Sequence, residues 1–167
     1  MRAAVLRGSP ERDQKGTTVK PGKVPFVDKL RPELQPEVAP DRKGRGLMLL
    51  PTPMLVAEAI AAVPAGEVIT GTELRDLLAQ RYDANLTCPL MTGIFLGLVA
   101  GAAEEQIAAG HDPVAPYWRV VRDDGAMNEK APYGPERQAE HLRREGHAVH
   151  LHGNRLKLDE FASRSRA

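Results

Sequence analysis

Apolar residues recur at helical spacing in the middle of the chain. After Thr52-Pro53, a pair that suits the start of a helix, they repeat at intervals of three and four residues. A second helix is expected after Thr70 or Thr72, either of which can cap it. A third is expected to begin at Cys88-Pro89 and to end at Gly110. The pattern therefore predicts successive helices joined by short turns.

Shorter patterns surround these helices. The apolar residues 48–50 are typical of a strand, and residues 135–145 are typical of a fourth helix. Apolar and polar residues alternate over 147–152, which predicts another short strand. Asp123-Asp124-Gly125 lies between two short extended segments and predicts a hairpin or loop that would form a wing. We therefore expect a mainly α, winged-helix-like helix-turn-helix domain with a small hairpin.

The N-terminal part of the chain differs in composition from the rest. Residues 1–46 carry 11 Lys/Arg and 6 Asp/Glu, whereas residues 47–167 carry 12 and 16. Frequent prolines make residues 1–46 an irregular, basic arm, although its apolar cluster (Val24, Phe26, Val27 and Leu30) can dock on the domain. The arm can follow DNA phosphates or act as a solubilising tail. The expected domain is 47–153, followed by a C-terminal tail, 154–167.

The overall composition predicts a soluble globular protein, which we expect to be a monomer. Hydrophobic residues make up 42% and charged residues 27%, and no apolar segment is expected to reach the length of a membrane span. The first residues lack an apolar stretch of useful length, so we do not expect a secretory signal. The single cysteine, Cys88, cannot form an internal disulfide, and a cytoplasmic location is expected. His147, His150 and His152 lie close together without a nearby cysteine, and we expect neither a metal site nor a cofactor.

Five segments carry a resemblance to a known family. Val63–Thr70 resembles Ile-Pro-x-Gly-x-Val-x-Thr, and Pro116–Val120 resembles Pro-Cys-His-Arg-Val, both motifs of the O6-alkylguanine-DNA alkyltransferases. Asp112-Pro113, Arg119–Ala126 and Gly134–Gly146 resemble further segments of that family in the same order. The resemblance covers about residues 47–147. It implies a helix-turn-helix fold and double-stranded DNA as the partner.

The departures from the family pattern concern its chemistry. Tyr117 stands where the family has its acceptor cysteine, and Trp118 stands where it has histidine. In the family a glutamate acts together with this cysteine and histidine. Glu145 stands at the position of that glutamate, and we expect it to be structural. Gly71 replaces a family tyrosine, and residues 91–93 lack the arginine that fills the space of a flipped base. Phenols are weak nucleophiles because their pKa lies near 10.

A subgroup, the alkyltransferase-like proteins, keeps the fold and has an aromatic residue in place of the cysteine. Resemblance to this subgroup implies binding of O6-alkylguanine or a related damaged base without alkyl transfer, in support of DNA repair by other proteins. Tyr117 and Trp118 would stack on the flipped base, with one of them pointing inward, and Asn128 and Lys130 would close the pocket. The alternatives are that Trp118 belongs to the core and that Asn128 and Lys130 lie on an exposed loop.

Residues near the start of the third helix, together with one arginine, are the candidate DNA contacts. Hydroxyl and backbone groups, an apolar wedge and a guanidinium would supply these contacts, from Thr87, Met91, Thr92, Gly93 and Arg119. For Arg119 a structural role inside the domain is an equal alternative.

Two other functions remain open. Cys88 at a helix start, where a thiolate is favoured, is a candidate alkyl acceptor, so that the protein would be a methyltransferase-like enzyme. A small buried cysteine is the alternative interpretation of the same residue. The negative charge of residues 47–167 also suits a protein-interaction module that never meets DNA.

Overall fold

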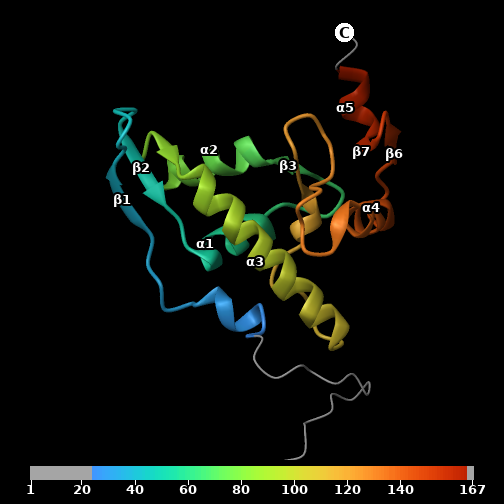
Figure 1. The fold of residues 1–167 in the computed structure, drawn as a ribbon, viewed down its shortest axis with the longest axis horizontal. Helices are drawn as coiled ribbons and strands as arrows, with labels where there is room; N and C mark the ends of the chain where they lie inside the picture. Colours follow the sequence, from blue (N-terminus) through green and yellow to red (C-terminus); the bar gives the residue numbers. More distant parts are fainter. Residues whose placement is uncertain (1–23, 165–167) are drawn as a thin grey trace, which may run out of the picture.

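A long helix, α3, runs through the centre of the protein, and the other elements pack around it (Figure 1). The structure is a computed structural model that describes residues 24–164, with side chains as far as residue 161. The helices are α1 (Pro53–Ala61), α2 (Gly71–Arg81), α3 (Pro89–Ala108), α4 (Gly134–Arg144) and α5 (Asp159–Arg164), with the 3-10 turns η1 (Val27–Leu30) and η2 (Tyr117–Arg119). The mainly α class expected from the sequence is confirmed.

Short strands connect these helices in small sheets. The strands are β1 (Glu37–Pro40), β2 (Leu47–Leu50), β3 (Ile69–Thr70), β4 (Leu86–Thr87), β5 (Val120–Val121), β6 (Val149–His152) and β7 (Arg155–Leu158). β2 pairs antiparallel with β1 and parallel with β4, β3 pairs parallel with β5, and β6 pairs antiparallel with β7. Because β4 leads directly into α3, the first sheet is attached to the beginning of that helix.

The helix starts follow the capping chemistry of the sequence. The Thr52 hydroxyl accepts a hydrogen bond from the Leu55 N–H, and Pro53 occupies the first turn of α1. Thr70 rather than Thr72 caps α2, in a capping box with Glu73. The Thr72 hydroxyl instead donates to Asp123, 2.6 Å away. Local sequence therefore set the first turns of both helices.

The core lies between α1, α2 and the second half of α3. Val56, Ile60, Leu74 and Val99 are fully buried there. By length and composition alone α3 could cross a membrane, so the expectation that no apolar segment reaches that length was wrong. The core helix of a soluble protein passes the same test, and α3 packs against both α1 and η1. The buried residues of α3 lie mostly in its second half, from Val99 to Glu104, which belongs to the core.

Residues 24–46 are not an irregular arm. Leu30 is buried, and the Phe26 ring lies so close to Gly101 of α3 that a Cβ there would be 2.4 Å from it. The backbone N–H groups of Phe26 and Val27 donate to the Glu105 carboxylate, at 2.9 and 3.1 Å. Of the apolar cluster, Phe26 and Leu30 dock on the domain as expected, whereas Val24 and Val27 are exposed. Residues 1–23 of the predicted arm lie outside the described residues.

Both predicted domain boundaries separate paired strands. The boundary at 46/47 lies between β1 and β2, and the boundary at 153/154 lies between β6 and β7. Prolines misled the first assignment, because β1 is an edge strand and Pro40 ends it without breaking the sheet. The predicted tail contains β7 and α5, although residues 165–167 lie outside the described part of the chain.

The predicted wing at residues 123–125 is a turn without a hairpin. Gly125 has φ +78°, its N–H donates to Arg122 O, and the Arg122 N–H donates to Ala126 O. Before this turn β5 pairs with β3, and after it Ala126 forms a bridge with Lys157. The Asp-Gly signal therefore gave the turn correctly, but strands distant in sequence supplied the pairing.

Substitution of Leu30 tests whether the η1 segment belongs to the folded domain. We expect Leu30→Ala to lower the free energy of unfolding by about 2–5 kcal/mol, because the change leaves a cavity beneath α3. Leu34→Ala is the matched control, since the Leu34 side chain is 39% exposed and its truncation should have little effect. Urea unfolding measures both variants, and equal stability for the two would contradict the docking of this segment.

Candidate functional site

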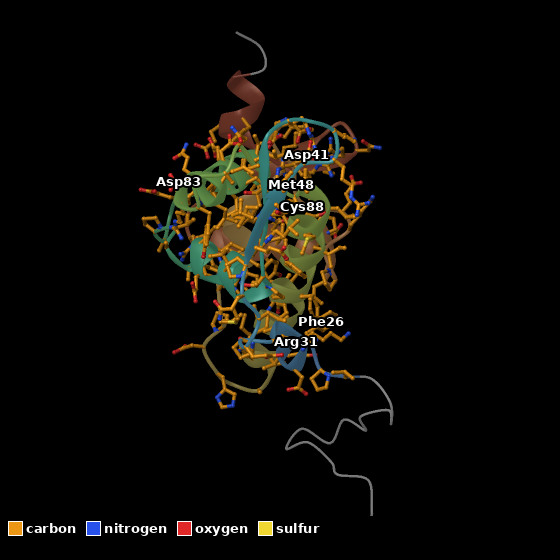
Figure 2. The ribbon with its side chains drawn as sticks, turned by 90° about the vertical axis from the view of Figure 1, so that its left-hand side faces the viewer. Phe26, Arg31, Asp41, Met48, Asp83 and Cys88 are labelled. Atoms are coloured by element: carbon orange, nitrogen blue, oxygen red, sulfur yellow. The ribbon has the colours of Figure 1, made fainter. Side chains whose placement is uncertain are left out.

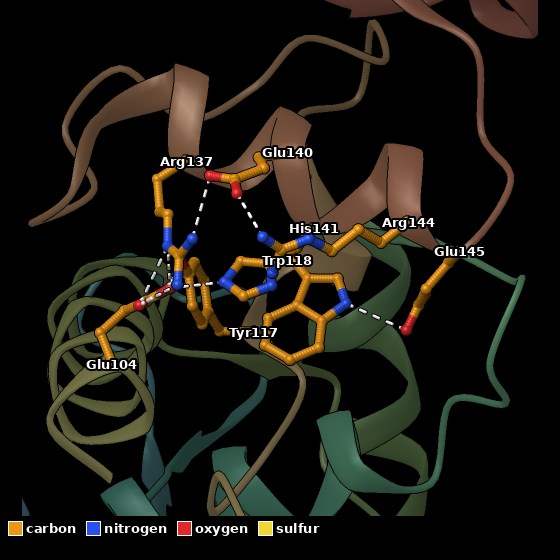
Figure 3. A network of polar contacts seen from close by, with 8 residues as sticks. All are labelled: Glu104, Tyr117, Trp118, Arg137, Glu140, His141, Arg144 and Glu145. Atoms are coloured by element: carbon orange, nitrogen blue, oxygen red, sulfur yellow. Dashed lines mark hydrogen bonds and ion pairs between the residues drawn. The ribbon is translucent and has the colours of Figure 1, made fainter. Parts of the chain in front are cut away.

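Glu104, on the buried side of α3, is the centre of a network of polar side chains (Figure 3). Its carboxylate accepts a hydrogen bond from the Tyr117 hydroxyl at 2.8 Å and from two guanidinium nitrogens of Arg137 at 3.0–3.1 Å. His141 Nε2 lies 2.6 Å from the same carboxylate. The network therefore connects η2 and α4 to α3.

The network decides the protonation of its members. Burial alone would raise the pKa of Glu104, but hydrogen bonds from Arg137, His141 and Tyr117 outweigh it and hold that pKa below its ordinary value. Burial, together with the Glu104 carboxylate, raises the pKa of Tyr117. Burial lowers the pKa of His141, although the contact with Glu104 opposes that shift. Tyr117 is therefore a neutral hydrogen-bond donor and a poor source of phenolate.

Trp118 and Arg119 form a second set of contacts on the other side of η2. The Trp118 ring stacks on His141 with centroids 4.1 Å apart, and its Nε1–H donates to Glu145 at 3.1 Å. Arg119 donates to Glu145 at 2.6 Å and to the Val63 carbonyl, also at 2.6 Å. Glu145 is thus the structural carboxylate expected from the sequence, and Arg119 holds the domain together instead of facing DNA.

The expectation that only one of Tyr117 and Trp118 points inward was wrong. Their side chains are both buried, with 4% and 9% exposed, and their rings meet edge to face. The reason is local geometry: η2 is a 3-10 turn, so these neighbours do not alternate across a sheet as they would on a strand. The start of this turn is held by hydrogen bonds from the Tyr117 and Arg119 N–H groups to preceding carbonyls.

The four residues of the predicted lesion pocket do not share one cavity. Tyr117 and Asn128 line a cavity of about 10 Å³, which has room for about one water molecule. Asn128 also lines a neighbouring groove of about 420 Å³, together with Gly93, Leu96, Arg75 and Arg122. Trp118 and Lys130 line neither space. The groove therefore adjoins the small cavity at Tyr117 without being lined by Tyr117, and it has room for a base.

Two of the predicted DNA contacts are buried structural residues. The Thr87 hydroxyl donates to the Arg75 carbonyl and the Thr92 hydroxyl to the Cys88 carbonyl, each at 2.8 Å, and both side chains are buried. Their hydroxyls satisfy backbone carbonyls inside the protein, so they cannot meet a ligand. Met91 is half-buried, and Gly93 is exposed. Of the predicted contacts on α3, Gly93 is thus the accessible one, with Met91 partly so.

The first half of α3 presents an apolar surface to solvent. Leu90 is 73% exposed and Ile94 is 53% exposed. A Cβ added at Gly93 or Gly97 would meet no atom within 4 Å, whereas Gly101 is covered by Phe26. We call Leu90, Gly93, Ile94 and Gly97 the α3 face. Of the three glycines of α3, Gly101 is thus the one with a close neighbour in the described structure.

Sequence reasoning missed the network residues Glu104, Arg137, Gln138 and His141. Gln138 is fully buried and donates to the carbonyls of Trp118 and Val120. A charge within the apolar segment of α3 was one available signal, because a buried carboxylate requires donors. The spacing of Arg137 and His141, one helical turn apart on α4, was the other.

Cys88 is distant from the network. It occupies the N-cap of α3, half-buried and without a side-chain capping bond, and lines a cavity beneath the β1–β2 turn. Along the helix axis it lies about 24 Å from Glu104. No histidine is among the described residues that line this cavity. Among the described residues, the Cys88 thiol therefore has no histidine in this cavity to act as its base, although Asp41, Lys43 and Arg45 line the same space.

The C-terminal histidines contact a carboxylate. His150 Nδ1 lies 2.9 Å from Asp159 and His152 Nε2 lies 3.1 Å from it, so both imidazoles connect β6 to α5. Within residues 24–161 no group of three or more His, Cys, Asp or Glu side chains is arranged to hold a metal ion.

Comparison with known proteins gives two structural neighbours. No protein-family model matches the chain, and no curated protein matches its sequence. The chain is similar to Schizosaccharomyces pombe Atl1 in complex with damaged DNA containing O6-carboxymethylguanine, with 21% identity and a TM-score of 0.45. It is also similar to S. pombe ATL in complex with DNA, with 23% identity and a TM-score of 0.44. Each match covers 64% of this chain and 88% of the other.

The network makes stability depend on pH. Because the pKa of His141 is lower in the folded protein than its ordinary 6.5, acidification protonates the unfolded chain first and lowers the free energy of unfolding. The lowered pKa of Glu104 acts in the same direction, but only at pH below its ordinary 4.5. We therefore expect stability to fall as pH drops below 6.5, and to fall less in His141→Gln, which keeps a donor for Glu104.

Urea unfolding at a series of pH values measures this difference. His111→Gln is the control, because His111 is exposed and outside the network. Parallel pH profiles for the wild type and His141→Gln would contradict the role of His141.

Proposed function

We propose that this protein binds double-stranded DNA through the α3 face and recognises O6-alkylguanine or a related damaged base. This proposal rests on the exposure of Leu90, Gly93 and Ile94 on α3, beside a groove, and on the free space next to the half-buried Gly97. Small residues let a helix approach another backbone closely, and apolar side chains can act as wedges between base steps. The ordered alkyltransferase motifs of the sequence favour DNA as the occupant.

The groove beside α3 is the proposed place for the damaged base. Its volume of about 420 Å³ is large enough for an extruded nucleotide. Its wall carries Arg75 and Arg122 together with the carboxylates of Asp123 and Asp124, so it offers both donors and acceptors to a base. Asn128 stands where the groove meets the small cavity at Tyr117 and offers an amide to the base. In this proposal Tyr117 supports the inner wall without stacking on the base.

We further propose that recognition occurs without alkyl transfer. The Tyr117 hydroxyl is buried and already donates to Glu104, and the raised pKa of Tyr117 disfavours the phenolate that an attack would need. The protein would then mark the lesion for other repair proteins, act in the cytoplasm and work as a monomer.

A binding titration with a duplex tests the role of the α3 face. We expect Ile94→Glu to weaken binding by about tenfold or more, because its carboxylate would face the phosphates. Leu151→Glu is the matched control, since Leu151 is 67% exposed on β6 and its replacement should leave binding unchanged. Unchanged affinity for Ile94→Glu would remove α3 from the interface.

The same titration separates lesion recognition from DNA binding. We expect the protein to bind a duplex containing O6-methylguanine with at least about tenfold higher affinity than the same duplex with guanine, at the same salt concentration. Equal affinity for the two would reject lesion recognition while leaving DNA binding in place.

An alkyl-transfer assay tests the enzymatic alternative. Incubation with DNA that carries radiolabelled O6-methylguanine should leave no label on the wild-type protein or on Cys88→Ser. We expect this result because no histidine lines the cavity of the Cys88 thiol within the described residues. Stoichiometric labelling of the wild type that Cys88→Ser abolishes would establish Cys88 as an alkyl acceptor instead.

The exposure of Leu90 and Ile94 also favours a second candidate, a surface that binds another protein. The two candidates differ in their dependence on salt. DNA binding weakens steeply as salt rises because counterions are released from the phosphates, whereas an apolar protein contact changes little. Absence of duplex binding at low salt would favour the protein partner.

A further inference from the structure

The turn between β1 and β2 is held in one conformation by a buried carboxylate. The side chain of Asp41 is only 4% exposed and accepts hydrogen bonds from the Lys43 N–H and the Arg45 N–H, each at 3.2 Å. The Arg45 guanidinium adds two more, at 2.8 and 3.1 Å. Gly44, at φ +74°, supplies the left-handed residue that the turn requires. The turn therefore has a fixed shape before any partner arrives.

Asn85 attaches this hairpin to the connection between α2 and α3. The Leu47 N–H donates to Asn85 Oδ1 and the Asn85 N–H donates to Leu47 O, both at 2.8 Å. Gly46 passes so close that a Cβ there would lie 2.3 Å from Asn85 Oδ1. The parallel pairing of β2 with β4 and the hydrogen bond from the Cys88 N–H to Leu49 O continue the attachment up to α3. The hairpin and the start of α3 thus form one rigid surface, as the positions of Asp41, Met48 and Cys88 illustrate (Figure 2).

The turn carries two cations that the fold does not use. Arg42 and Lys43 are exposed, and within the described part of the chain neither side chain makes a hydrogen bond or an ion pair. Arg45, in contrast, is paired with Asp41. A cavity of about 410 Å³ lies between the turn and the start of α3, and Arg42, Lys43 and Pro89 are among the residues that line it. Positive charge is therefore concentrated near the start of α3, and the start is also the exposed half of this helix.

We propose that the β1–β2 turn is the wing of this protein and that Arg42 and Lys43 contact the phosphate backbone of the duplex on which α3 docks. This inference rests on the proposed function and adds a second contact to it. Phosphate is the partner that fits, because two unpaired cations on a rigid turn can neutralise two negative charges without reading a sequence. The negative balance of residues 47–167, with 12 Lys/Arg against 16 Asp/Glu, makes a local source of positive charge necessary for binding DNA.

The wing predicts a change in salt dependence. Each lost phosphate contact reduces the slope of log affinity against log salt by about 0.9, so Arg42→Ala with Lys43→Ala should reduce it by about 1.8. The wild type should accordingly bind more tightly than this double variant, and the ratio of their affinities should shrink about tenfold between roughly 50 and 200 mM salt. Titration of the full-length protein with a plain duplex at several salt concentrations gives these slopes.

Lys29→Ala with Arg31→Ala is the matched control. It removes the same charge from η1 and from Arg31, the residue that follows η1, at the opposite end of α3 (Figure 2). We expect the control to keep the wild-type slope, and circular dichroism to show that both double variants are folded. If the control and the wing variant lose affinity and slope equally, net charge alone explains the binding and the wing is rejected.

The remaining outcomes distinguish the wing from the proposed function. If the wild type binds duplex DNA and the wing variant keeps its affinity and slope, the wing is wrong and the DNA-binding function stands. If the wild type does not bind duplex DNA at low salt, the proposed function fails and the wing fails with it.

Discussion

The buried charge of Glu104 is the interaction on which the arrangement of this protein depends. A carboxylate inside a protein destabilises the fold unless donors surround it, and here the donors come from η2 and α4. The Tyr117 hydroxyl, Arg137 and His141 can reach one carboxylate only if both elements lie against the second half of α3. Satisfying this single charge therefore fixes the relative positions of three segments that are far apart in sequence.

This network changes the meaning of the aromatic pair Tyr117 and Trp118. In the sequence they stand where the alkyltransferases have their reactive residues, and an aromatic platform for a base was the natural expectation. In the fold Tyr117 donates to Glu104 and Trp118 stacks on His141 and donates to Glu145. The pair is thus part of the framework that supports a site, and the open space lies outside it, between Asn128 and α3.

The two halves of α3 have different roles. The second half is covered by α1, η1 and the Glu104 network, with Gly101 small enough to admit the Phe26 ring. The first half leaves Leu90 and Ile94 exposed and is attached through β4 to a hairpin that carries unpaired cations. Charge and apolar exposure therefore coincide at one end of the helix, and this end is where we place the partner.

Local signals in the sequence determined the helices and turns, because capping and periodicity act between neighbouring residues. The structure has the expected helix start at Thr52-Pro53, a cap at Thr70 and the turn at Gly125. They could not determine the partners of distant groups. Thr87 and Thr92 looked available for DNA, yet both hydroxyls satisfy backbone carbonyls, and prolines concealed the strand that pairs with β2. Only the tertiary structure decided these contacts, since a buried polar group takes whichever partner the packing brings near, and spacing along the chain does not encode that partner.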